Sequence, residues 1–199
     1  GYGNYNTKTG EAVLDVTLVP NTLGIRFAGT IADGDGWQFN PAQNRRVGTT
    51  KNIGGRVSLR WQPSSALEVN LKVYGARDNP LAPNPYGLGQ LAEGRDALGY
   101  SRFDPAQNGG RALGRDEVSA DTGGSYFTSD AGVSLSIDYK INDHFSVTSI
   151  SGFDYGTYRN APFDCDGSPN DLCAIRYYSN SRNFNEDLRV SYKSERLNI

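Results

Sequence analysis

The 199-residue sequence contains no methionine and only one histidine, His144. No apolar run approaches the roughly 20 residues that a membrane-spanning helix needs. The net charge of −2 gives little attraction for phosphate groups and argues against a nucleic-acid partner. No basic segment followed by an apolar one begins the chain, so no signal peptide is visible. The sequence therefore predicts no membrane-spanning helix within these residues and disfavours a nucleic-acid partner.

Cysteine is also scarce, since only Cys165 and Cys173 are present, within one polar stretch. Two free thiols are one interpretation. We favour a disulfide, because exposed thiols in so polar a segment would be a chemical liability, and a disulfide implies an oxidising compartment. A metal site is less favoured because no histidine or third cysteine lies nearby to complete a tetrahedral set. We expect neither a metal nor a cofactor.

Glycine and tyrosine, by contrast, are abundant, with 24 and 12 residues. This composition, with few helical patterns, favours an all-β chain. The mean hydropathy of −0.57 is low. It does not exclude a membrane barrel, because barrel strands expose apolar side chains only at alternate positions and their loops are polar.

Residues 67–78, LEVNLKVYGARD, carry the clearest pattern. Leu67, Val69, Leu71 and Val73 alternate with polar side chains. Successive side chains of a strand point to opposite faces, so this segment predicts a strand with one apolar and one ionic face. The same alternation predicts further strands at residues 7–19, 23–32, 56–62, 133–141, 145–158 and 178–192, and the start of another at 197–199. Residues 90–98 are predicted to form a short helix.

Short turns and long loops alternate between these predicted strands. The short turns are residues 20–22, 63–66, 142–144 and 193–196, and the long loops are residues 33–55, 79–132 and 159–177. If neighbouring strands are antiparallel, all short turns lie at one end of the sheet and all long loops at the other. Outer-membrane barrels show this asymmetry, with short periplasmic turns and long extracellular loops. A soluble β-sandwich is the alternative; it fits the alternation but not the loop asymmetry or the strand length.

Several segments resemble a known family. The opening YGNYNTKTGEAVLDVTLVPNTLGIRFAGTIADGDGW resembles the first barrel strands of TonB-dependent outer-membrane receptors, and RVSLRWQPSSALEVNLKVYGARD resembles the next hairpin. FSVTSISGFDYGTY and NFNEDLRVSY are similar to later strands of that barrel. The resemblance implies an all-β, antiparallel transmembrane barrel of about 22 strands, of which residues 1–199 supply seven and the start of an eighth. The plug domain and the C-terminal strands are then expected to lie elsewhere.

The resemblance implies a function in the bacterial outer membrane. Such receptors bind a scarce solute, often a ferric siderophore, and import it when the TonB–ExbB–ExbD system pulls on the plug. The expected partners are therefore outer-membrane lipid, TonB–ExbB–ExbD and a siderophore-like ligand. A passive porin or a structural barrel is the alternative. An enzyme on a barrel would need a dyad or triad, and a soluble carbohydrate-binding sandwich is a fourth hypothesis.

Four arginines form the notable basic cluster: Arg45, Arg46, Arg56 and Arg60. Arg56 and Arg60 are expected to face the lumen near the Arg45–Arg46 loop, where the cluster would attract an anionic chelate. An equally weighted interpretation is that these arginines pair with carboxylates of the plug or the lumen. Aromatic side chains in the loops could stack on an aromatic or sugar ligand.

Other candidate sites are weaker. His144 lies in a predicted turn and is expected to be solvated rather than a general base. Acidic and amide residues flank the cysteines, at Asp164, Asp166, Asn170 and Asp171. They could hold calcium, but their spacing is not that of a known calcium loop, and a solvated acidic loop is favoured. The hexapeptides FNPAQN at residues 39–44 and FDPAQN at residues 103–108 are expected to be similar turns rather than paired ligand contacts.

Overall fold

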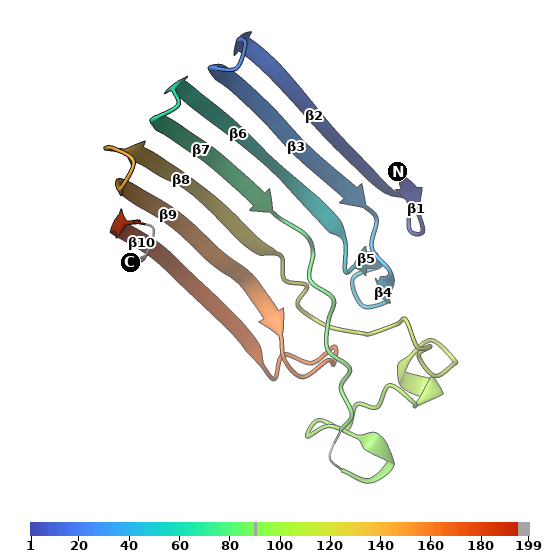
Figure 1. Cartoon of the computed structure of the whole chain (residues 1–199). Coiled ribbons are helices and arrows are strands. Elements are labelled where there is room, and N and C mark those ends of the chain that lie inside the picture. The colour runs from blue at the N-terminus through green and yellow to red at the C-terminus, as the bar shows by residue number, and fades with distance from the viewer. Residues whose placement is uncertain (90, 195–199) are drawn as a thin grey trace.

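A single open sheet of eight antiparallel strands organises the chain (Figure 1). The structure, a computed structural model, describes residues 1–89 and 91–194. The strands follow the order β1-β2-β3-β6-β7-β8-β9-β10, and a separate hairpin pairs β4 with β5. Their bounds are β1 Tyr2–Gly3, β2 Thr7–Val19, β3 Leu23–Gly34, β4 Gln38–Asn40, β5 Arg45–Val47, β6 Thr50–Ser64, β7 Leu67–Asp78, β8 Tyr126–Lys140, β9 Phe145–Asp164 and β10 Ala174–Tyr192.

The prediction of an all-β, antiparallel sheet is confirmed, and β2 and β7 have the predicted bounds. Other strands are longer than predicted. Strand β6 begins at Thr50 instead of residue 56, and β8 at Tyr126 instead of residue 133. The added ends contain Gly54, Gly55 and Gly132, which carry no side chain to reveal the alternation. The predicted strand at 197–199 and part of the turn at 193–196 lie outside the described residues.

One face of the sheet is apolar and exposed. Cross-strand pairing joins residues of seven strands into one continuous apolar row: Leu14, Phe27, Val57, Val73, Val133, Phe153 and Phe184. The exposed fraction along this row runs from 38% at Val133 to 72% at Phe184. No second layer covers this face in the part of the chain that the structure describes.

The opposite face is polar and carries ion pairs between side chains of neighbouring strands. Arg26 Nε donates to Asp15 Oδ1 at 2.6 Å, and Arg60 Nη2 donates to Glu68 Oε2 at 2.9 Å. Tyr74 of β7 reaches across Gly132 of β8 and donates its hydroxyl to Asp154 of β9. A side chain at position 132 would close this path, because a Cβ there would lie 2.5 Å from Tyr74 Oη and from Asp154 Oδ1.

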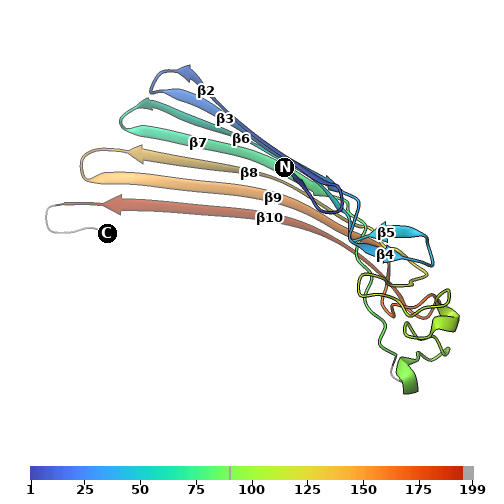
Figure 2. The ribbon, with the colours of Figure 1, turned by 90° about the vertical axis from the view of Figure 1, so that its right-hand side faces the viewer.

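The two ends of the sheet differ as predicted. The turns at one end are short: residues 20–22, 65–66 and 141–144. The connections at the other end are residues 35–49, 79–125 and 165–173, and Figure 2 shows them gathered beyond the loop ends of the curved strands. The sheet is not closed: β1 and β2 lie at one edge and β10 at the other.

The long connections fold into a small module of their own. Its buried apolar side chains are Val47, Ala82, Tyr100, Leu113, Val118 and Ala120. The predicted helix at 90–98 is wrong for residues 91–98, and residue 90 lies outside the described residues. Ala92–Gly94 forms one 3₁₀ turn, in which Glu93 and Gly94 take positive φ values of 62° and 65°, and such values interrupt an α-helix. No helical turn among the described residues is long and apolar enough to cross a membrane.

We expect Gly132→Ala to destabilise the sheet by about 1–3 kcal/mol, because its Cβ displaces Tyr74 and leaves the Asp154 carboxylate without its hydroxyl donor. Gly29→Ala is the matched control, since the nearest atom to a Cβ there is Gly54 O at 3.7 Å. Thermal unfolding of both variants measures the difference. Equal melting temperatures for the two variants would contradict the role of Gly132.

Candidate ligand-binding site at the loop end

A cavity of about 660 Å³ opens at the loop end of the sheet, where four segments meet. It is lined by Tyr5, Trp37, Phe39, Asn44, Arg45, Arg46, Asp116 and Glu117. Its volume falls in the range typical of small-molecule sites. The lining combines three aromatic rings with two arginines and two carboxylates, so it can stack against flat groups and bind charged ones.

Backbone geometry around the β4–β5 hairpin places the indole of Trp37. Gly36 and Gly48 take positive φ values of 89° and 68°, a conformation that residues with a side chain rarely adopt. A Cβ at Gly48 would lie 2.5 Å from Trp37 Nε1. The indole therefore lies against the bare backbone at Gly48.

Two buried amides of β4 attach the hairpin to the 79–125 connection. Gln38 donates to the carbonyl of Asn84 at 3.0 Å and accepts from the Asn84 N–H at 2.7 Å. Asn40 makes the same pair of bonds to Ala120, at 3.0 Å and 3.2 Å. Phe39, between them, points to the cavity side, and its N–H donates to Asp116 O at 2.8 Å. Each amide therefore bonds both the C=O and the N–H of one residue, as the backbone of a neighbouring strand would. Together the two amides fix the β4 wall of the cavity to the 79–125 connection.

The structure places Arg45 and Arg46 in the cavity wall. Arg45 donates to Gly123 O at 2.9 Å, and its Nε is buried and finds no acceptor among the described residues. Arg46 is exposed, donates to Trp37 O at 3.4 Å and lies 5.9 Å from the ring centroid of Tyr5. In the described part of the chain the Arg46 guanidinium donates only this one hydrogen bond, so its other N–H groups are available to a ligand.

Arg56 and Arg60 lie elsewhere, on the polar face of β6. Strand β6 starts at the loop end, so at about 3.3 Å per residue Arg60 lies about 30 Å further along the sheet than Thr50. Arg60 is bonded to Glu68 and Gln62, which fits the interpretation that it pairs with a carboxylate on its own face. Arg56 and Lys72 form no ion pair within the described residues, and both line two hollows of about 530 and 580 Å³. The four arginines do not line one cavity.

The carboxylates of the cavity differ in their partners. Glu117 accepts from Arg111 at 2.5 and 2.6 Å and from the Gly114 N–H at 2.8 Å. These donors, the arginine first, lower the pKa of Glu117 to about 2. Asp116 lines the same cavity and accepts no side-chain hydrogen bond within the described residues, so it is the carboxylate of this wall without a committed partner.

Sequence reasoning missed most of this wall. Tyr5, Phe39, Asp116 and Glu117 are far apart in the chain, and no spacing in the sequence links them. The only available signal was the presence of aromatic residues, among them Trp37, in otherwise polar loops.

The other candidates can now be placed. His144 is exposed, as expected, and its Nδ1 lies 2.9 Å from Lys193 O. Both hexapeptides form turns, and Gln43, Gln107 and Asn108 donate to backbone carbonyls of the loops. Cys165 and Cys173 form the predicted disulfide, with a Cα–Cα distance of 5.4 Å. The expectation of a solvated acidic loop is correct for Asp171 but wrong for Asp164, whose exposed fraction is 0%.

Among the described residues, no group of three or more His, Cys, Asp or Glu side chains is arranged to hold a metal ion. No family model matches the chain.

We expect Glu117→Gln to speed hydrogen exchange of the Gly114 amide at pH 7, because the amide loses its carboxylate acceptor. The folded-state pKa of about 2 lies below the ordinary value of 4.5, so the stabilisation by the carboxylate is complete above pH 4.5 and is lost as the pH falls toward 2. The difference between wild type and variant should shrink over that interval. Glu93→Gln is the control, since its carboxylate is 76% exposed. A pH-independent difference would contradict this assignment.

Proposed function

We propose that this chain is part of the barrel of a TonB-dependent outer-membrane receptor that imports a ferric siderophore or a similar scarce anionic solute. The observation that carries the proposal is the sheet itself. Its apolar face is exposed across seven strands, its opposite face is ionic, and its turns are short at one end and long at the other.

The exposed apolar face supports contact with lipid. Contiguous apolar patches of more than a few hundred Å² are rare on soluble monomers and mark an interaction surface. A soluble sandwich would bury the apolar row, which runs across the sheet from Leu14 on β2 to Phe184 on β10, under a second sheet. The described residues supply no such layer. In this proposal the bilayer covers the row, and the ion pairs of Arg26 and Arg60 face an aqueous lumen.

The open edges support a larger barrel. Within the described residues, strand β10 and most of β2 carry unpaired backbone groups along one side. In hydrocarbon each such group costs several kcal/mol, so a spanning sheet must close on itself. Further strands that pair with these edges are therefore part of the proposal.

The cavity at the loop end supports binding of an anionic, partly aromatic solute. In a barrel with long extracellular loops it would open outward. Arg46 offers free donors, and Tyr5, Trp37 and Phe39 offer flat surfaces. Ferric catecholate chelates combine negative charge with planar chelating groups. TonB–ExbB–ExbD would supply the energy through a plug domain.

Paired cysteine variants of the intact gene product test which face meets lipid. Val57→Cys and Ser58→Cys change adjacent residues of β6 that point to opposite faces of the sheet. The native Cys165 and Cys173 form a disulfide and so do not react with the dye. An environment-sensitive dye at position 57 should be quenched by nitroxide-labelled lipid, and the same dye at 58 should not. Equal quenching at both positions, or none at 57, would exclude the lipid-facing assignment.

Uptake of radiolabelled ferric siderophores by cells carrying the intact gene distinguishes active transport from a passive porin. We expect an uncoupler of the proton gradient to abolish uptake, because TonB is driven by inner-membrane energy.

Arg46→Ala should weaken binding of the ferric chelate by about tenfold, the loss of one charge-assisted hydrogen bond of about 1.4 kcal/mol. Arg189→Ala, on the polar face of β10, is the control. Uptake that persists without a proton gradient would favour the porin instead.

A further inference from the structure

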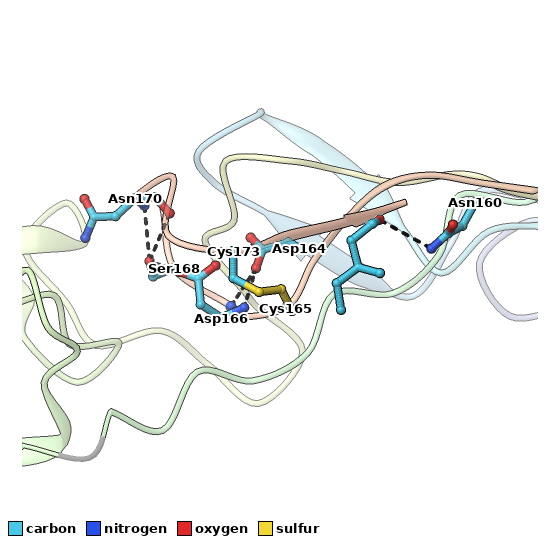
Figure 3. The surroundings of a disulfide bond; sticks show 9 residues. Asn160, Asp164, Cys165, Asp166, Ser168, Asn170 and Cys173 are labelled. Atoms are coloured by element: carbon cyan, nitrogen blue, oxygen red, sulfur yellow. Dashed lines mark hydrogen bonds between the residues drawn. A yellow bond between two sulfur atoms is a disulfide. The ribbon is translucent and has the colours of Figure 1, made fainter. Parts of the chain in front are cut away.

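The disulfide loop between β9 and β10 encloses a carboxylate that is fully buried (Figure 3). Asp164, the last residue of β9, lies among the loops with an exposed fraction of 0%. Its Oδ1 accepts the N–H groups of Asp166 at 2.9 Å and Gly167 at 2.7 Å. Its Oδ2 is buried and has no donor in the part of the chain that the structure describes. One oxygen of this buried carboxylate, Oδ2, therefore has no hydrogen bond from the described residues to offset the loss of water.

A second carboxylate in the same turn, that of Asp166, also has one oxygen without a hydrogen-bond donor among the described residues. Asp166 Oδ2 accepts the hydroxyl of Ser168 at 2.6 Å, but Asp166 Oδ1 is buried and has no donor among residues 1–89 and 91–194. The carboxylates of Asp164 and Asp166 lie next to one another. An acceptor without a donor costs free energy in a buried position, and two such carboxylates cost more. A positive group placed between them would remove both penalties.

No side chain of the described residues provides that positive charge. Arg95 lines the adjoining cavity, but its guanidinium is bonded to Glu93 and Asp104. Asp96 lines the same cavity, adds negative charge and accepts from Asn170 at 3.2 Å. The surroundings therefore favour a cation from solution.

The turn is held rigidly enough to form a site. The Cys165–Cys173 disulfide closes its base, and the Cys165 N–H donates to Cys173 O at 3.2 Å. Gly167 takes a φ of 65°, and the backbone at Gly87 packs directly against Asp166 and Gly167. The unpartnered oxygens are consequently fixed before any ligand arrives.

We propose that Asp164 Oδ2 and Asp166 Oδ1 bind a calcium-class divalent cation in the disulfide loop. Calcium takes oxygen ligands in irregular arrangements and accepts neutral oxygens and water beside carboxylates. The cavity of about 500 Å³ lined by Asp166, Ser168 and Asp96 gives water and the ion a path to the site. Magnesium fits less well because it demands near-ideal octahedral geometry. The bound ion would hold the two carboxylates of the turn together.

The test is hydrogen exchange of the Asp166 and Gly167 amides in the intact protein, first treated with a chelator and then titrated with calcium chloride. Sites with few charged ligands bind calcium with Kd of about 10⁻⁴–10⁻³ M. About 10 mM calcium should then slow exchange about 10- to 100-fold. Magnesium at the same concentration should have a smaller effect.

Two variants test whether the slowing of hydrogen exchange by calcium depends on the Asp166 carboxylate. Asp166→Asn should abolish it, because the new amide donates to Asp164 Oδ2 and removes one ligand charge, so the fold is retained without calcium. Asp171→Asn, which changes an exposed carboxylate in the same loop, should respond like wild type. If calcium leaves wild-type exchange unchanged while Asp166→Asn is fully folded, the two carboxylates share a proton instead and the proposal is wrong. An equal calcium response in wild type and Asp166→Asn would also overturn it.

Discussion

The register of the antiparallel strands is the constraint on which the rest of the structure depends. Each strand alternates apolar and polar side chains, and the pairing aligns these alternations so that seven strands share one apolar row. A slip of one residue in any strand would move its apolar side chains to the ionic face. The short turns at residues 20–22, 65–66 and 141–144 limit such slips, because they fix which residues face one another.

Stability of the sheet must come mainly from backbone pairing and from whatever covers the apolar face. The ion pairs on the polar face are exposed, with Arg26 and Asp15 at 55% and 61%, and exposed pairs contribute little. Their role is to keep charged side chains compatible with one another on a wet surface. Contacts such as that of Tyr74 with Asp154 across Gly132 join three strands and add specificity of pairing.

The loops follow different rules from the sheet. Their apolar core is small, and polar side chains replace backbone pairing at several points. Gln38 and Asn40 each bridge the hairpin to a distant backbone segment, and the disulfide closes the connection between β9 and β10. Such an arrangement can present a varied surface for binding while the sheet below remains regular.

The sequence by itself determined the strands with strong alternation, the asymmetry of turns and loops, and the disulfide. These features depend on local chemistry: side-chain period, turn residues and two cysteines in one short stretch. Glycine-rich strand ends escaped detection, because Gly54, Gly55 and Gly132 have no side chain to show a period. The helix predicted at 90–98 does not form over residues 91–98, because Glu93 and Gly94 take positive φ values that interrupt an α-helix.

Only the tertiary structure decided how the loops combine. It brought Tyr5, Trp37 and Arg46 to one cavity, separated Arg45 and Arg46 from Arg60 along the length of β6, and buried Asp164 in a loop whose composition suggested solvent. The reason is that long connections are positioned by contacts between residues far apart in sequence. Those contacts are set by packing and by buried hydrogen bonds, and no local pattern encodes them.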